Sequence, residues 1–243
     1  MNPSPALFTS AHLRARIVKV LLIAGAVATG ISLLAEALSL ALPPFTEEQE
    51  LADNPSGAVI VLTIFLLALL ETFIYLTTVV FFLVWLYRAS ANVRAFDPWR
   101  RLNHSPGWAV GSFFVPFLNL VVPYRAVKEV WQKSGPPDEA LLAEPSPPAW
   151  FPIWWLFWLL ASFAGNISLR ASFNESVPVS TATTISMVAG ALSIVAALLA
   201  YLVVDAIDDR QEETSKTVKL GQFSGPPPPP ANLTMPDAVA PTA

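Results

Sequence analysis

Residues 106–124, PGWAVGSFFVPFLNLVVPY, are the stretch on which the topology of this chain depends. The stretch is apolar and nearly as long as the roughly 20 residues that a helix needs to cross a bilayer. Its middle, however, contains Pro116 and Asn119, and a proline inside a helix costs about 3 kcal/mol or more. Basic residues also stand close on both sides. Whether this segment crosses decides the number of spans.

The composition of the whole chain is that of an integral membrane protein. Of the 243 residues, 54% are hydrophobic and only 13% are charged, which is about half the charge of an ordinary soluble domain. Long apolar runs occupy 17–42, 57–87, 150–168 and 181–204. Each run is long enough to cross a hydrocarbon core of about 30 Å as a helix. The first run exceeds the roughly 7–15 apolar residues of a signal peptide, so we expect it to remain as an anchor.

The distribution of Lys and Arg indicates that 106–124 does not cross. If the segment stays on the cytoplasmic side and the N-terminus is also cytoplasmic, every Lys and Arg except Arg170 lies inside. If the segment crosses, the basic residues divide almost evenly between the two sides. The positive-inside rule favours the first arrangement. We therefore predict an all-α protein with four transmembrane helices in the plasma (inner) membrane, with the N- and C-termini cytoplasmic.

Between the second and third runs, residues 88–149 are expected to form an element on the cytoplasmic face. Drawn as a helix, 106–124 is weakly amphipathic, as an interfacial helix would be. A short re-entrant segment covered by other helices would also accommodate Pro116, and both alternatives stay open, with the interfacial or partly embedded helix preferred. Residues 124–133 follow as an amphipathic surface helix, in which Glu129 precedes a lysine at the favourable i, i+4 spacing.

The two ends of the chain are predicted to be cytoplasmic. Residues 1–16 form a short N-terminus, and 205–243 form an acidic and then proline-rich tail that should be disordered. The beginning of this tail, DAIDDRQEE (205–213), places carboxylates on one face if the fourth helix continues. We expect that face to be solvated, or docked against the basic surfaces of 88–101 or 125–133, or, with least support, to bind a metal ion.

Two carboxylates lie inside apolar runs and are candidate functional residues. Glu71 is near the middle of the second run, with Tyr75 one helical turn away, and Glu36 is towards the end of the first run. A charged carboxylate in mid-bilayer costs a few kcal/mol, so such residues usually face other helices. The functional hypothesis is a site for a proton or a cation between the first two helices. The alternative, which we favour, is a protonated glutamic acid that hydrogen-bonds across a helix interface for packing.

Where the second run ends, Arg88 and Asn92 lie one helical turn apart. Arg88 is expected either to reach a lipid phosphate or to pair with Glu129 of the surface helix. Both roles are structural. The tryptophans that open the third run, Trp150, Trp154, Trp155 and Trp158, fit an aromatic belt at the inner interface of the membrane.

Two motifs in the middle of the chain resemble a known family. They are WLYRASAN (85–92) and PGWAVGSFFVPFLNLVVPYRAVKEVW (106–131). Together they resemble a bacterial family of multi-pass membrane proteins known as domain of unknown function 4328, and the family-like domain would cover about 57–205. The resemblance implies a membrane location and no particular activity. The candidate residues of this inner-face motif are Trp85, Arg88, Asn92, Pro106, Gly107, Trp108, Pro116, Asn119, Pro123, Tyr124, Glu129 and Trp131.

The residue types present exclude several classes of chemistry. The chain has no cysteine, and its two histidines, His12 and His104, are far apart in the sequence. These counts exclude disulfides, thiolate metal sites and cysteine nucleophiles and make a histidine metal site unconvincing. We also expect no cofactor, no metal site, no catalytic residue and no nucleic-acid partner. The function expected first is that of a non-enzymatic membrane interaction or scaffold protein, whose partners are the lipid bilayer and a membrane protein or a second copy. A small transporter or channel-like component that uses Glu71 and Glu36 is the alternative, and a lipid-modifying enzyme at the inner face is a weaker one.

Overall fold

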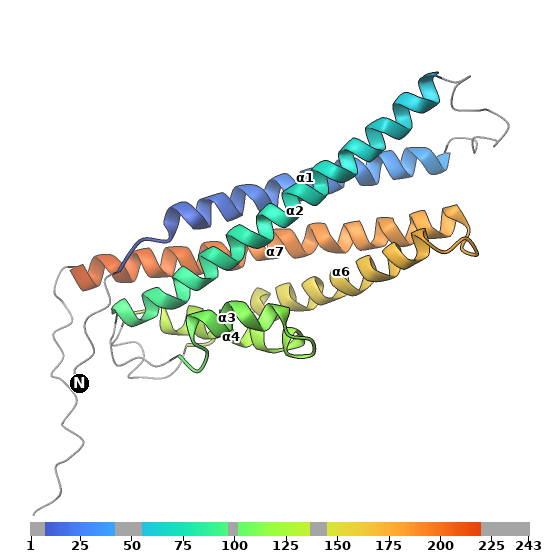
Figure 1. Ribbon diagram of the computed structural model, residues 1–243. Coiled ribbons are helices and arrows are strands. Elements are labelled where there is room, and N and C mark those ends of the chain that lie inside the picture. Colours follow the sequence, from blue (N-terminus) through green and yellow to red (C-terminus); the bar gives the residue numbers. More distant parts are fainter. Residues whose placement is uncertain (1–7, 42–54, 97–101, 137–144, 220–243) are drawn as a thin grey trace, which may run out of the picture.

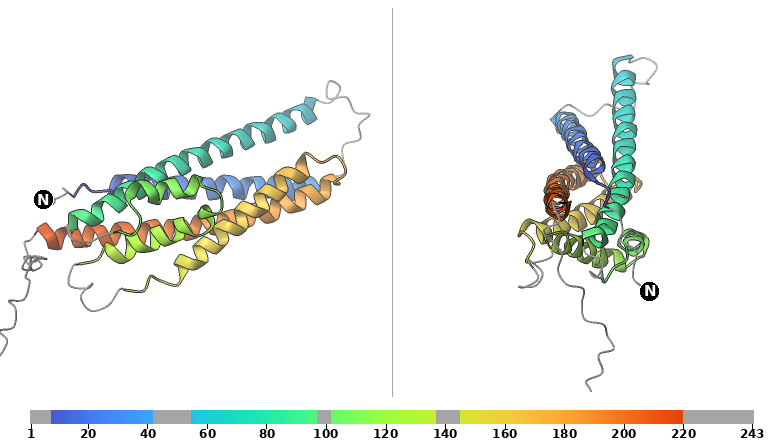
Figure 2. Two further views of the ribbon diagram at one scale, coloured as in Figure 1. Left: turned by 60° about the horizontal axis from the view of Figure 1, so that its bottom comes forward. Right: turned by 90° about the vertical axis from the view of Figure 1, so that its left-hand side faces the viewer.

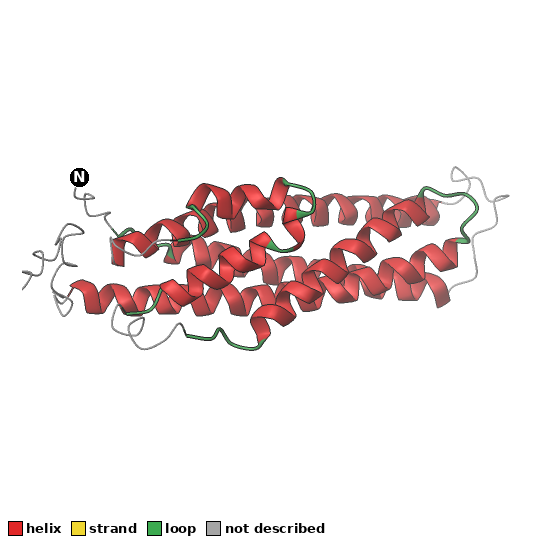
Figure 3. Ribbon diagram, turned by 90° about the horizontal axis from the view of Figure 1, so that it is seen from below, coloured by secondary structure: helices red, strands yellow, loops and turns green. Residues whose placement is uncertain are grey.

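The computed structural model describes residues 8–41, 55–96, 102–136 and 145–219. Within them the chain consists of helices joined by loops, and no strand is present (Figure 3). The all-α fold class is therefore confirmed for the described part of the chain. The prediction of a disordered tail over 205–243 is wrong for its acidic part, because the chain is helical as far as Lys219. The proline-rich part, within 220–243, lies outside the described residues.

Four long helices form the body of the protein and lie side by side as an elongated bundle (Figure 1). They are α1 (His12–Ala41), α2 (Pro55–Phe96), α6 (Trp150–Ser172) and α7 (Val179–Lys219). Each contains a segment that is long and apolar enough to cross a membrane. The four helices agree in number and in position with the four predicted apolar runs. Two of them are longer than those runs, since α2 continues to Phe96 and α7 to Lys219.

The packing order of the long helices is α2, α1, α7, α6. Helix α1 packs against α2 on one side and against α7 on the other, and α6 packs against α7. No extensive contact joins the described parts of α2 and α6. Helix α2 diverges from the other three towards its N-terminal end (Figures 1 and 2). The bundle is therefore open between α2 and α6.

A helical hairpin, residues 106–133, lies between α2 and α6 in the half of the bundle where α1 begins and α7 ends (Figure 2). Its first arm contacts α2, and its second arm contacts α2, α6 and α7. The hairpin thus covers the opening between α2 and α6 in one half of the molecule only. Its elements are α3 (Pro106–Gly111), η1 (Ser112–Phe114), η2 (Leu118–Leu120) and α4 (Val122–Lys133).

The backbone of the hairpin corrects the preference for one interfacial helix over 106–124. The α-helix ends at Gly111, and the chain becomes extended at Val115. Pro116 follows, and Phe117 has a φ of 63°, a conformation that L-residues other than glycine rarely adopt. A continuous helix is excluded because Pro116 cannot donate to the preceding turn. The chain therefore reverses here and returns as α4.

Helix α4 agrees with the predicted amphipathic helix 124–133, but more of its residues are buried than a helix on the surface would bury. It begins at Val122, and Val127 and Val130 on its apolar face are fully buried. Of the four tryptophans expected in an aromatic belt, Trp150 is exposed, whereas Trp154 and Trp155 are buried within the protein. The hairpin covers these side chains and extends the apolar core into this half of the bundle. In the opposite half most large apolar side chains are exposed, which suits a helix surrounded by lipid.

Candidate functional site

The buried side of the hairpin is fixed by aromatic side chains of α6 and α2. The indole Nε1 of Trp155 donates to the carbonyl oxygen of Leu120 over 2.9 Å, which satisfies a backbone acceptor beside the turn. The ring of Phe113 meets Trp155 and Trp158 edge to face, each at a centroid distance of 6.3 Å, and Phe82 at 6.0 Å. The tip is therefore held against the bundle by a specific polar contact and by aromatic packing.

The base of the hairpin is fixed by the carboxylate of Glu129, which is buried. It accepts hydrogen bonds from the backbone amides of Asn103 and His104, from His104 Nδ1 at 2.8 Å and from Lys133 Nζ at 2.9 Å. Burial alone would raise the pKa of this carboxyl, but these hydrogen bonds outweigh it and hold the pKa below its usual value. Glu129 thus ties the entry of the hairpin to its second arm. The predicted i, i+4 contact with Lys133 is present.

The predicted pairing of Arg88 with Glu129 is wrong. The guanidinium Nε of Arg88 donates to the backbone oxygen of Thr9 over 3.2 Å. The side-chain amide of Asn92 donates to the same oxygen over 3.1 Å and to Gln211 Oε1 over 3.2 Å. These two motif residues therefore attach the start of α1 and the end of α7 to α2.

Sequence reasoning missed the polar layer that surrounds Asn92. Gln211 is buried in α7 and donates to Ala89 O over 2.8 Å and to Ser134 Oγ over 2.9 Å. Thr214 donates to Ser134 O over 2.8 Å. The available signal was the recurrence of polar residues along one face of α7, at 208, 211 and 215, where all three side chains are buried.

The other motif residues have structural positions. Pro106 is the first residue of α3, where its missing amide costs nothing. Gly107 is exposed, and a Cβ atom there would meet open space, so the fold does not require glycine at this position. The ring of Trp131 lies 4.4 Å from the guanidinium carbon of Arg210. Packing against the core involves Trp85, Pro123 and Tyr124.

The opposite side of the hairpin is apolar and exposed. Phe117 at the turn is 85% exposed, and Phe114 is 70% exposed. Trp108 on the first arm is 45% exposed. Pro116 is exposed between them, whereas Asn119 is half-buried, and its Oδ1 is buried without a partner among the described residues. The hairpin therefore exposes aromatic rings on one side, while its other side packs against α6 and α2.

The two carboxylates of the apolar runs, Glu36 and Glu71, line one groove in the half of the bundle that the hairpin does not cover. Ser32 donates to Glu71 Oε1 over 2.7 Å, and Ser186 donates to Glu36 Oε1 over 2.9 Å. Each carboxyl is thus linked to a serine of another helix, as the packing hypothesis expects. The groove measures about 350 Å³, and Tyr75, which is 63% exposed, is not among its lining residues. Further hydroxyls line it at Thr29, Ser168, Ser172 and Ser193.

Part of the acidic face of 205–213 docks within the molecule, but not on either predicted basic surface, whereas Asp209 and Glu213 are exposed, as the solvated alternative expects. Asp205 accepts from Lys19 Nζ over 2.6 Å, and the buried carboxylate of Asp208 lies 2.7 Å from His12 Nδ1. Both partners belong to the first turns of α1. Among the described residues, no group of three or more His, Cys, Asp or Glu side chains is placed to hold a metal ion.

Four long apolar helices, an open bundle and an apolar hairpin in one half indicate a helical, multi-pass membrane protein. The chain matches the model of the family described as "Domain of unknown function (DUF4328)" over residues 57–209, more than half of its length. It belongs to this family, which confirms the resemblance of its two motifs. Neither a comparison with curated proteins nor one with solved structures finds a match.

Proposed function

We propose that the protein is a membrane interaction or scaffold protein without enzymatic activity, and that the hairpin contacts a transmembrane helix of a partner. The observation that carries this proposal is the turn at Phe117. Its unusual φ of 63° holds the ring 85% exposed, while Trp155 fixes the backbone beside it. Strained backbone persists where the surrounding structure imposes it, and such positions cluster at ligand and partner contacts.

The depth of the hairpin supports a partner inside the membrane. Phe113 contacts Trp158, which lies two helical turns, about 10 Å, beyond Phe151 along α6. Phe151 itself packs on Trp131 in the second arm. The tip therefore reaches towards the membrane interior from the end of the bundle that carries most of the basic residues. By the positive-inside rule that end is cytoplasmic, in keeping with a protein of the inner membrane whose termini are both cytoplasmic.

Site-specific photo-crosslinking in cells tests this proposal. A crosslinker at residue 117 should give one discrete protein adduct, whether with another protein or with a second copy. The same group at Phe163, which is 57% exposed on α6, serves as the lipid-facing control and should give none. Trp108→Ala should reduce the adduct at 117, because Trp108 lies on the same exposed side. Adducts with lipid alone at both positions would refute a protein partner.

A second candidate function rests on the groove of Glu36 and Glu71. In this proposal the protein is a small transporter or channel-like component, and the groove binds a proton or a cation. Two carboxyls and several hydroxyls line that groove. Glu71→Gln should abolish the cellular phenotype of the protein at unchanged expression, whereas Glu175→Gln in the exposed loop before α7 should not. Wild-type behaviour of Glu71→Gln would exclude this function. A lipid-modifying enzyme has less support, because Asp205 and Asp208 are engaged by α1.

A further inference from the structure

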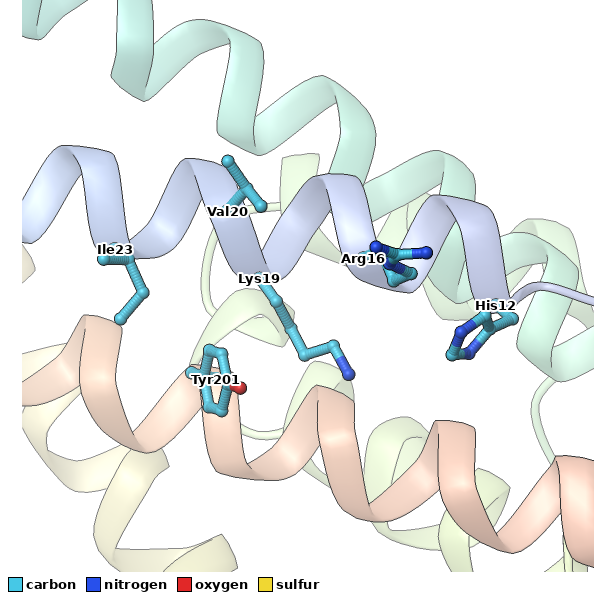
Figure 4. Close-up of a pocket in the computed structure, with 6 residues that line it drawn as sticks. All are labelled: His12, Arg16, Lys19, Val20, Ile23 and Tyr201. Atoms are coloured by element: carbon cyan, nitrogen blue, oxygen red, sulfur yellow. The ribbon is translucent and has the colours of Figure 1, made fainter.

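A second groove lies between the first turns of α1 and the adjoining part of α7, on a surface that neither proposal uses. It measures about 420 Å³ and is lined by His12, Arg16, Lys19, Val20, Ile23 and Tyr201 (Figure 4). Three of these residues are basic, and they occupy successive turns of one face of α1. The other side chains of α1 in the groove are apolar. The groove is thus divided along α1 into a basic end and an apolar end.

Arg16 supplies the charge that the basic end offers to a ligand. Lys19 and His12 are held on the α7 side by Asp205 and Asp208, so both side chains face an acidic partner. Arg16 is exposed and has no hydrogen-bond or ion-pair partner in the part of the chain that the structure describes. Its guanidinium keeps all its donors available, in the planar arrangement that suits two oxygens of a phosphate.

Tyr201 completes the basic end from α7. Its ring lies below Lys19, with 5.8 Å between the amine nitrogen and the ring centroid. Its hydroxyl is drawn on the side of the ring that is nearer to the amine of Lys19 (Figure 4). The hydroxyl can donate one hydrogen bond, so it adds a neutral donor beside the basic groups.

The apolar end lies on the membrane side of these groups. Val20 is 67% exposed and Ile23 is 40% exposed, and both follow Arg16 and Lys19 along α1 into the apolar run. A phospholipid has the same polarity, with a phosphate at the interface and acyl chains towards the bilayer centre. The order of side chains along α1 therefore matches one lipid molecule from headgroup to chain.

We propose that this groove binds the phosphate of an anionic phospholipid, with Arg16 and Tyr201 holding the phosphate and Val20 and Ile23 contacting an acyl chain. The inference is independent of the hairpin and of the groove around Glu36 and Glu71. It requires only that α1 crosses a bilayer and that its basic end lies at an interface.

Native mass spectrometry of the full-length protein in nonionic detergent tests the proposal. The protein is titrated with short-chain phosphatidylglycerol, with phosphatidylcholine of the same chain length and with inorganic phosphate. We expect wild type to retain one phosphatidylglycerol molecule more tightly than either of the other two. Arg16→Gln should weaken that binding about tenfold, because one charge-assisted contact is lost. Tyr201→Phe, which removes only a hydroxyl, should weaken it about threefold.

Arg14→Gln is the matched control, since Arg14 lies two residues away on the opposite face of α1 and does not line the groove. It should leave binding within about twofold of wild type. Equal losses in Arg14→Gln and Arg16→Gln would overturn the proposal, because they would indicate attraction to net charge alone. Binding of inorganic phosphate as tight as that of phosphatidylglycerol would also overturn it, because the acyl contact would then contribute nothing.

Discussion

Glu129→Gln is the substitution for which the structure gives the clearest expected magnitude. The two carboxylate oxygens accept from two backbone amides, from His104 Nδ1 and from Lys133 Nζ. Glutamine has nearly the same shape but replaces one acceptor oxygen with an NH₂ group. Whichever way the amide is oriented, its NH₂ group faces N–H donors at this site. At least one backbone amide therefore loses its acceptor.

The expected loss of stability is about 3 kcal/mol. A hydrogen bond to a charged group contributes about 1.5–3 kcal/mol, and a buried donor left without an acceptor costs about 1–3 kcal/mol. The lower part of both ranges applies because His104 can rotate towards solvent, its side chain being 20% exposed. Lys128→Gln, in the same helix and outside the Glu129 hydrogen bonds, should change stability by less than about 0.5 kcal/mol.

Denaturation of the purified protein in mixed micelles measures this difference, and hydrogen exchange at Asn103 and His104 locates it. The pH dependence gives a second, independent result. Because the folded pKa of Glu129 is depressed, its contribution is fully present above the pKa of the unfolded chain and is lost as pH falls through the folded pKa. The stability gap between wild type and Glu129→Gln should therefore be constant near neutral pH and narrow in acid. Equal stability of the two proteins at pH 7 would refute the role of Glu129 as the tie at the base of the hairpin.

Three further predictions concern topology and packing. Reporter fusions at residues 103 and 135 should both report the cytoplasmic side, and opposite sides would show that the hairpin segment crosses the membrane. In the same denaturation assay, Gly190→Val should destabilise the protein by about 1–3 kcal/mol, since a Cβ atom there would lie 2.9 Å from a leucine side chain of α1. Its control is Gly30→Ala, where a Cβ atom meets open space, and this variant should be neutral or slightly stabilising. Gln211→Leu should cost about 2–3 kcal/mol by leaving buried polar partners unsatisfied, and a wild-type midpoint would contradict the importance of the polar layer.

Several features of the site were predictable because they depend on local order in the sequence. The amphipathic pattern after Tyr124 predicted α4, and the i, i+4 spacing predicted the contact between Glu129 and Lys133. Two of the offered alternatives were wrong, the pairing of Arg88 with Glu129 and the docking of the acidic face on 88–101 or 125–133. Charges of both signs are common at this end of the bundle, so charge alone does not select which basic residue meets which acid. That selection depends on the axial register of α1, α2 and α7, which no spacing within one helix reveals.

The sequence by itself determined that the chain is an all-helical protein with four apolar helices and that it belongs to its family. The physical reason is that a membrane span needs only a long apolar run, and such a run is visible without knowledge of any contact. Only the tertiary structure decided what 106–124 becomes. Pro116 forbids a continuous helix, Trp155 holds the backbone beside the reversal at Phe117, and the carboxylate of Glu129 holds the base of the hairpin. These contacts join residues far apart in the chain, and together they bury one side of the hairpin and expose the other.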